Sequence, residues 1–219
     1  MKRKLIFLIG ASGSGKDTAA DYLCKTYGYH KVASYTTRPM REGEENGREH
    51  TFLHWGAVAH DPSAWLERRG MHLLAKTYYG GHYYFTAMEQ LTHREADKPR
   101  RKKKAVVLSN PSDSNHTLHD PHLTPIHPHT PVIYIIDETG LVDMMGDTIR
   151  KNWLTDNFDF ELWHIARCGG ISDTKRTQRD ANRTTLPDDA YDIHIHNIYD
   201  IDYLYSVLDS IHAKMHVTQ

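Results

Sequence analysis

A glycine-rich loop, flanked by an apolar run and an amphipathic segment, constrains this chain more than any other feature. The loop spans residues 10–16 and reads Gly-Ala-Ser-Gly-Ser-Gly-Lys, which matches the pattern G-x-x-x-x-G-K. The apolar run at 4–9 predicts a buried strand, and the apolar spacing after Lys16 predicts a helix that Gly28 ends. In this context the pattern predicts a phosphate-binding loop, because backbone N–H groups and the positive end of the helix converge on phosphate oxygens.

This loop predicts a site for ATP, with Lys16 reaching the β- and γ-phosphates. The next residue is Asp17, where a Ser or Thr usually holds Mg²⁺. Mg²⁺ keeps several waters readily, so we expect phosphates and water to hold it, and we assign no protein ligand to a metal. Asp17 serves equally well as a negative charge at the start of a helix. The predicted ATP-binding residues are Gly10, Ser12, Gly13, Ser14, Gly15, Lys16, Asp17 and Thr18.

The rest of the chain predicts an α/β fold, a parallel sheet with helices on both faces. Strand patterns occur at 32–37, 105–108, 132–136 and 192–196, and residues 200–215 place their apolar side chains on one helical stripe. Residues 139–185 read as mainly helical and polar. Strands separated by helical segments favour a parallel sheet with covering helices.

Composition excludes several classes of protein. The net charge is −1, so no overall field would hold the chain on nucleic acid or on an anionic membrane. Two cysteines, Cys24 and Cys168, exclude a disulfide framework and a cysteine-based zinc site. No apolar run approaches the roughly 18–20 residues that span a bilayer. We expect a cytoplasmic protein with no membrane partner and no nucleic-acid partner, and the sequence leaves the oligomeric state open.

Two further patterns are given their simpler interpretation. The basic run at 98–104 is typical of a solvated edge beside a strand. A loop at 109–131 carries five histidines and two aspartates, a composition that could bind Zn²⁺ or Ni²⁺. The four prolines at 121, 125, 128 and 131 make this loop extended rather than convergent, so we interpret it as solvated. Its histidines are His116, His119, His122, His127 and His129.

Two later segments resemble the guanylate kinase family. Residues 34–44, Ser-Tyr-Thr-Thr-Arg-Pro-Met-Arg-Glu-Gly-Glu, resemble that family's signature S-x-x-T-T-R-x-x-R-x-G-E. Residues 81–86, Gly-His-Tyr-Tyr-Phe-Thr, resemble its segment G-N-Y-Y-G-[ST]. With the phosphate loop, these motifs follow the family's order over roughly the first 86 residues. The resemblance implies a P-loop NTPase-type sheet with an inserted lobe for a nucleoside monophosphate, a lid, and ATP with Mg²⁺ as cofactors.

The resemblance also implies an acceptor site. Arg38 and Arg41 supply two guanidinium forks for a second phosphate. His50 stands where the family has a tyrosine, and an imidazole can still donate a hydrogen bond to phosphate. The family's acids for the guanine edge have no counterpart at 71–77 or 109–110, which predicts altered base recognition. The predicted substrate-binding residues are Ser34, Arg38, Arg41, His50, Tyr84 and Thr86.

Arginines late in the chain are expected to form a lid. Arg176, Arg179 and Arg183 fall at i, i+3 and i+7, and therefore share one helical face. Closing over the transferred phosphoryl group, such arginines stabilise the charge on its oxygens. Positioning and electrostatics then carry the reaction, and we nominate no general base. The predicted catalytic residues are Lys16, Arg150, Arg167, Arg176 and Arg179.

We therefore expect one kinase domain over residues 1–219 that phosphorylates a nucleoside or deoxynucleoside 5′-monophosphate. Its core comprises 1–33, 91–149 and 186–219, its monophosphate lobe 34–90 and its lid region 150–185. Two alternatives stay open. One is a kinase of another phosphorylated acceptor such as ribose 1,5-bisphosphate. The Gly-Lys-Asp variant at residues 15–17 also appears in that related kinase. The other is a catalytically silent guanylate-kinase-like binding module.

Overall fold

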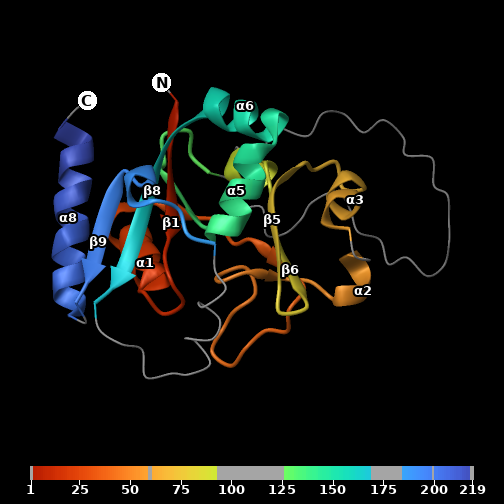
Figure 1. Ribbon diagram of the computed structural model, residues 1–219, viewed down its shortest axis with the longest axis horizontal. Coiled ribbons are helices and arrows are strands. Elements are labelled where there is room, and N and C mark those ends of the chain that lie inside the picture. The colour runs from red at the N-terminus through yellow and green to blue at the C-terminus, as the bar shows by residue number, and fades with distance from the viewer. Residues whose placement is uncertain (1, 59–60, 93–125, 169–183, 199, 218–219) are drawn as a thin grey trace. The chain divides into compact units, whose positions relative to one another are not determined.

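The computed structural model describes residues 2–58, 61–92, 126–168, 184–198 and 200–217 (Figure 1). The chain divides into two compact units. The first comprises Met1–Val32 and His129–Gln219, and the second is Ala33–Pro128. The second unit is therefore an insertion in the first, and it extends further along the chain than the lobe expected at 34–90.

The first unit contains a parallel sheet with β1 at its centre. Its described strands have the order β2-β7-β1-β8-β9, and every pairing is parallel. Leu5–Ile9 are fully buried, as expected for a strand that is covered on both faces. The strands are β1 (Arg3–Ile9), β2 (His30–Lys31), β7 (Val132–Ile135), β8 (Phe158–Arg167) and β9 (Ile193–Asn197).

Helices flank this sheet, and the expected fold class is confirmed. Helices α1 (Lys16–Tyr27) and α8 (Ile201–Val217) pack on one core, which includes Ile6, Leu8 and Trp163. Helices α5 (Glu138–Gly146) and α6 (Thr148–Asn157) follow β7, and a 3₁₀ turn, η1 (Asp188–Ala190), precedes β9. In Figure 1, α8 lies on one side of β8 and β1, and α5 and α6 lie on the other.

Aromatic and polar contacts hold α8 against α1. The carboxylate of Asp209 accepts hydrogen bonds from the hydroxyls of Tyr22 and Tyr27, each at 2.7 Å. Tyr22 also stacks on Tyr205, with ring centroids 3.9 Å apart. The hydrogen bonds from Tyr22 and Tyr27 lower the pKa of Asp209. Helix α8 is therefore part of the first unit's core.

The second unit has its own sheet and its own core. Its described strands have the order β4-β3-β6-β5, and Tyr35, Trp65 and Phe85 pack beneath them with Leu66. The tight turn at Gly80-Gly81 has φ of 59° and 81°, which suits a two-residue hairpin. The elements are β3 (Tyr35–Thr36), β4 (Thr51–Phe52), α2 (Trp55–Val58), α3 (Pro62–Glu67), β5 (Leu73–Tyr79), β6 (His82–Ala87) and α4 (Glu89–Thr92).

Several sequence expectations are confirmed. The first strand, the strands at 132–136 and 192–196, and the helix at 200–215 are found within a few residues of their expected bounds. Gly28 ends α1 with φ of 70°, and its N–H donates to the carbonyl of Cys24. A left-handed residue here costs glycine little, because glycine has no Cβ.

Two expectations were wrong. Residues 32–37 do not form one strand, because the chain passes from the first unit to the second at Val32 and Ala33. Residues 158–167, expected to be helical and part of the lid region at 150–185, form β8 between β1 and β9. Asp159 and Glu161 make this strand look too polar for a sheet. Both pair with Lys4 on β1, at 3.1 and 2.6 Å, and this satisfies their charges.

Other expectations lie outside the described residues. These are the strand at 105–108, the basic run at 98–104, the lid arginines Arg176, Arg179 and Arg183, and His116, His119 and His122. In the part of the chain that the structure describes, no helix is both long and apolar enough to cross a membrane.

Candidate functional site

The phosphate loop follows β1 directly and requires glycine where its backbone turns. Gly10 has φ of 153°, and a Cβ there would lie 2.3 Å from the carbonyl oxygen of Ile165 and 2.8 Å from Ser14 Oγ. Gly15 has φ of 104° and precedes the first turn of α1. A Cβ on Gly15 would lie 2.6 Å from Asn197 Nδ2. The glycines of the motif therefore fit both the turn and the close approach of neighbouring strands.

Lys16 lies over the loop that it is predicted to serve. Its Nζ donates to the carbonyl oxygens of Gly10 at 2.8 Å and Ala11 at 2.7 Å. These carbonyls belong to the first two residues after β1, so the ammonium group is held at the entrance of the loop. A phosphate oxygen is a stronger partner for an ammonium group than a neutral carbonyl.

Two residues from the ends of neighbouring strands contact the loop. Asn197, the last residue of β9, donates from Nδ2 to the carbonyl of Ser14 at 2.9 Å. Arg167, the last residue of β8, donates from Nη1 to the carbonyl of Gly13 at 3.4 Å. Carboxyl ends of parallel strands share one edge of a sheet, where ligands of α/β proteins bind. Arg167, expected in a lid, thus belongs to the loop's own surroundings.

Asn197 was missed by sequence reasoning. The signal for it was present, since Asn197 directly follows the alternating run 192–196, which was expected to be a strand. A polar residue at the carboxyl end of a parallel strand is a candidate for the site at that edge.

Asp17 lies in the first turn of α1 and faces a lysine from β2. The Nζ of Lys31 is 3.8 Å from Asp17 and 2.6 Å from Asp21, one helical turn further on. The side chain of Asp17 is 69% exposed. This geometry favours its use as a charge at the helix start. The neighbouring Thr18 is half-buried in the same turn.

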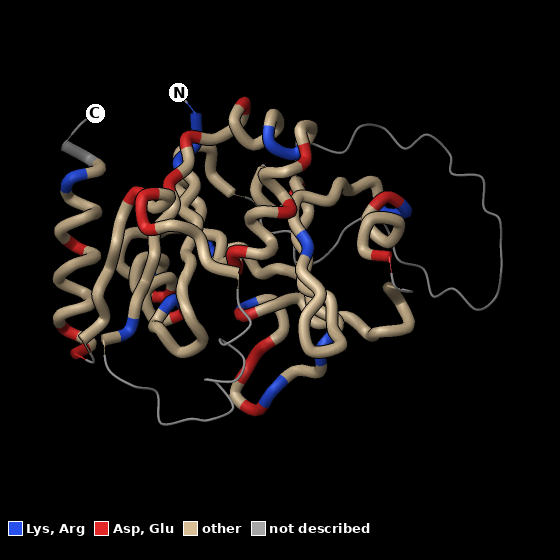
Figure 2. Tube along the Cα trace, in the orientation of Figure 1, with Lys and Arg blue, Asp and Glu red and all other residues tan. Residues whose placement is uncertain are grey.

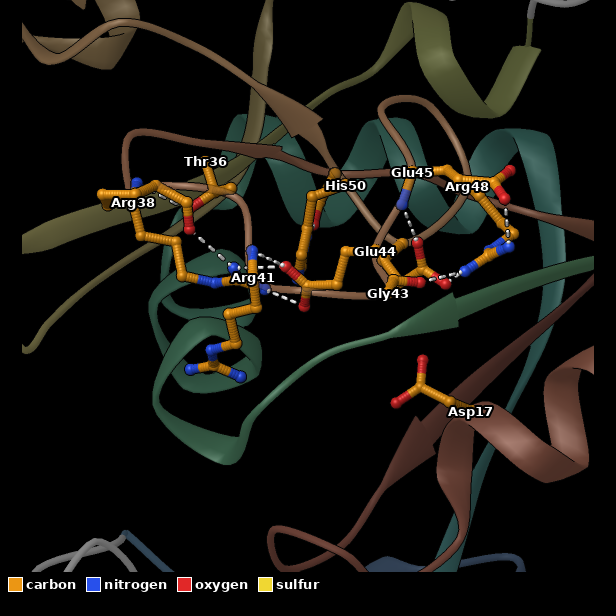
Figure 3. A network of polar contacts seen from close by, with 12 residues as sticks. Asp17, Thr36, Arg38, Arg41, Gly43, Glu44, Glu45, Arg48 and His50 are labelled. Atoms are coloured by element: carbon orange, nitrogen blue, oxygen red, sulfur yellow. Dashed lines mark hydrogen bonds and ion pairs between the residues drawn. The ribbon is translucent and has the colours of Figure 1, made fainter.

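In the second unit, the loop between β3 and β4 gathers acidic and basic residues, as Figure 2 shows. Figure 3 shows its centre, where both η nitrogens of Arg38 bond to the carboxylate of Glu44, at 2.7 and 2.6 Å. Glu44 also accepts a hydrogen bond from the backbone N–H of Arg41 at 2.8 Å. The hydrogen bonds from Arg38 lower the pKa of Glu44 to about 2.

The two predicted phosphate arginines are therefore not equivalent. Arg38 is buried, with its planar fork on Glu44 and its guanidinium 5.1 Å from the ring centre of Phe52. The side chain of Arg41 is exposed and extends away from Glu44 (Figure 3). Glu44 was not among the predicted site residues, although the Gly-Glu that ends the 34–44 signature contains it. It connects the two arginines through one carboxylate.

Three further residues predicted to bind the acceptor substrate lie around Arg38 and Glu44. Ser34 Oγ is 2.9 Å from Nδ1 of His50, and the His50 ring meets Tyr84 edge to face with centroids 5.8 Å apart. Tyr84 also interacts with Arg38. Burial lowers the pKa of the Arg38 guanidinium, but Glu44, with a smaller contribution from Tyr84, raises it overall. Ser34, Arg38, His50 and Tyr84 thus form one connected group within the second unit.

Thr86 completes the expected acceptor set. It lies two residues after Tyr84 on β6, so both side chains leave the same face of the strand. Thr86 is fully buried, and its hydroxyl has no hydrogen-bond partner among the described residues. A buried hydroxyl in this state has a hydrogen bond to offer to a ligand.

Arg150, predicted to be catalytic, is bonded to two aspartates. It lies on α6, where its Nη1 donates to Asp143 at 2.7 Å and its Nε is 3.3 Å from Asp147. Its Nη2 donates to the backbone carbonyl of Asp143. A guanidinium with these partners joins α5 to α6, and the catalytic role expected for Arg150 stays a prediction. Arg176 and Arg179 lie outside the described residues.

Comparison with known proteins identifies the family. A family model for guanylate kinase matches residues 2–127. Among solved structures, the guanylate kinase from Anaplasma phagocytophilum is similar at 13% sequence identity, with a TM-score of 0.48, over 100% of this chain and 88% of that one. No curated protein matches the chain. Because the family model spans more than half of the 219 residues, and the phosphate loop and the 34–44 signature both lie within it, this chain belongs to the guanylate kinase family.

Proposed function

We propose that this protein transfers the γ-phosphoryl group of ATP to a nucleoside or deoxynucleoside 5′-monophosphate. The observation that carries this proposal is the geometry of residues 10–16, a glycine cradle between β1 and α1 with Lys16 held at its entrance. Membership of a family of nucleotide kinases supports the same reaction.

ATP fits the residues that surround this cradle. Side chains are excluded at Gly10 and Gly15, so the backbone N–H groups of the loop can approach phosphate oxygens closely. Ser14 is fully buried, and its Oγ lacks a hydrogen-bond partner among the described residues. We assign Lys16 to the β- and γ-phosphates. We assign Arg167, which lies beside Gly13, to the negative charge on the transferred phosphoryl group.

Mg²⁺ would neutralise charge on the phosphates when bound. The chain presents Asp17 where a hydroxyl ligand usually lies, and the Asp17 carboxylate faces Lys31. We therefore propose that phosphates and water hold the ion. Thr18 is the hydroxyl residue that is nearest in sequence to the usual ligand position, residue 17.

The acceptor phosphate is assigned to the connected group of the second unit. Arg41 supplies an exposed guanidinium, and Arg38 supplies a buried one whose orientation Glu44 fixes. Ser34 and Thr86 supply hydroxyls for a base. Hydroxyls can donate or accept, so such a pocket tolerates several bases.

We propose that base selectivity is correspondingly modest. A site rejects a base strongly when that base leaves the site's buried polar groups without hydrogen-bond partners. Here β5 (Leu73–Tyr79) carries no acid that would select the guanine edge in this way. Losing one charged contact removes discrimination of roughly 10- to 150-fold. A preference for GMP or dGMP beyond about 10⁴-fold would contradict this proposal and point to an acid recruited from elsewhere.

The test is a coupled assay of ADP release with Mg·ATP and each of the eight common ribo- and deoxyribonucleoside monophosphates, together with ribose 1,5-bisphosphate. We expect turnover with at least one nucleotide. Turnover with the bisphosphate alone would identify a different kinase. Binding of nucleotides without turnover under any condition would identify a silent binding module.

A pair of lysine variants controls this assay. Lys16→Ala should lower turnover by at least about 10²–10³-fold, because it removes charge stabilisation at the transferred group. Lys25→Ala changes an exposed lysine in the last turn of the same helix and should leave turnover unchanged. Near wild-type turnover in Lys16→Ala would overturn the assignment of the loop.

A further inference from the structure

His50 occupies a defined position within the acceptor group. Its Nδ1 lies 2.9 Å from Ser34 Oγ, so Nε2 is directed to the opposite side of the ring. Phe52 and Tyr84 meet the ring edge to face, at 5.9 and 5.8 Å between centroids. The backbone of His50 is also held, because its carbonyl accepts from the N–H of Gly47 at 2.8 Å. These contacts orient the imidazole from three sides.

The surrounding loop is short of positive charge for a phosphate dianion. Between residues 38 and 49 it carries three arginines and four glutamates. Glu44 neutralises Arg38, and Arg48 pairs with both Glu45 and Glu49 (Figure 3). Of the other groups packed on the His50 ring, Ser34 and Phe52 are uncharged. Tyr84 presents the edge-to-face ring contact already described.

We propose that His50 binds the acceptor phosphate as an imidazolium, so that binding of the monophosphate is coupled to uptake of a proton. This inference rests on the proposed function and adds the charge state of one residue that binds the acceptor phosphate. Protonated, His50 adds a positive charge to that of Arg41, in a loop whose glutamates outnumber its arginines. A hydrogen bond from a charged donor is also roughly twice as strong as one from a neutral donor.

The sign of the pH dependence follows from this coupling. Imidazoles change charge between about pH 5 and 8, so the contribution of His50 is present at the acid end and lost as the pH rises. The phosphate group itself gains its second negative charge near pH 6, and this acts in the opposite direction. A variant without the imidazole therefore shows the phosphate contribution alone.

The test compares binding in wild type and His50→Gln by calorimetric titration at pH 6 and pH 8, without ATP. The probe is whichever of the eight common nucleoside monophosphates wild type binds best. Glutamine places a neutral N–H donor near the position of Nε2. We expect wild type to bind about five- to tenfold more tightly than His50→Gln at pH 6, and nearly equally at pH 8. His54→Gln, an exposed histidine of the same unit, should follow the wild-type profile.

A second measurement excludes a merely structural role. In proton NMR, the His50 ring signal is assigned by its loss in His50→Gln, and its titration midpoint should rise when the monophosphate binds. If His50→Gln does not fold, His50→Tyr supplies another neutral donor. Parallel pH profiles for wild type and variant, or an unchanged midpoint, overturn the inference alone. Failure of wild type to bind any of the eight monophosphates overturns the proposed function as well.

Discussion

At the scale of single residues, the sequence singles out Arg38 and Arg41 but does not show which groups surround them. The spacing of Arg38 and Arg41 sets them apart, because the motif around them is specific. Their partner Glu44 has no such signal, since pairing within an irregular loop follows no periodicity. Arg150 shows the converse, because its aspartate partners on α5 and at the start of α6 are apparent only once the helices are placed.

The different surroundings of Arg38 and Arg41 predict different effects of their removal. Both Arg38→Ala and Arg41→Ala should raise the acceptor KM by roughly 10- to 150-fold, because each removes a charge-assisted contact, and both should leave the ATP KM unchanged. Only Arg38→Ala should also lower the melting temperature, because it leaves Glu44 without its cation. The double variant Arg38→Ala, Glu44→Ala should recover part of that loss. Equal effects on both substrates would mean that the lobe is wrongly assigned.

The depressed pKa of Glu44 predicts a pH dependence of stability. Its pKa is about 2 in the folded chain, against an ordinary value of 4.5. Its contribution is therefore present above about pH 4.5 and is lost as the pH falls from there toward 2. Denaturant unfolding of wild type and Glu44→Gln over this range should give curves that converge at the acid end. Curves that remain parallel would show that Glu44 does not stabilise the fold through its charge.

At the scale of elements, apolar periodicity predicted what lies in the core and failed where polar residues enter the sheet. The strands β1 and β7 and the helix α8 were predicted, because each has a continuous or regularly spaced apolar set. The strand β8 was taken for part of a helical region. Its Asp159 and Glu161 are satisfied by Lys4, which lies about 155 residues away in sequence. Local pattern cannot register such a partner.

The phosphate loop gives a prediction at this scale, because its backbone excludes a side chain. Gly10→Ala should lower the free energy of unfolding by about 1–3 kcal/mol or more and abolish binding of a fluorescent ATP analogue. Gly146→Ala is the matched control, since a Cβ at the end of α5 would meet nothing within 4 Å. It should be neutral or stabilise by up to about 1 kcal/mol. Similar losses in both variants would mean that the strain at Gly10 has been overestimated.

At the scale of the whole molecule, the chain consists of two units with separate cores. The sequence predicted an inserted lobe beginning at residue 34, one residue after the observed start. It placed the end of the lobe at residue 90, whereas the second unit extends to Pro128. The strand expected at 105–108, assigned to the core, lies outside the described residues. For the base, the sequence predicted hydroxyl contacts from Ser34 and Thr86 and no acid for the guanine edge. It could not predict which base is bound, since the groups that contact a base come from several segments of the chain.

Because the two units have separate cores, we expect the two substrates to slow hydrogen exchange in different parts of the chain. In hydrogen exchange followed by mass spectrometry, an ATP analogue should slow exchange in β1 and α1. A nucleoside monophosphate should slow exchange in β3 and β6. At 100 times its dissociation constant, each ligand should stabilise the unit that it binds by about 2.7 kcal/mol. Protection of both units by either ligand alone would contradict this division of the site.

The way the second unit joins the first has a consequence for protein engineering. Among the described strands of the parallel sheet, β2 is the last before the second unit and β7 is the first after it, and these two strands are paired, with His30 opposite Val132. Exit and return therefore lie side by side on adjacent strands. On the proposed assignment, an acceptor module from another kinase can be transplanted between Val32 and His129 without adding or removing any described strand of the parallel sheet. Natural recombination at the same junction would let a lineage exchange its acceptor while the phosphate donor stays the same.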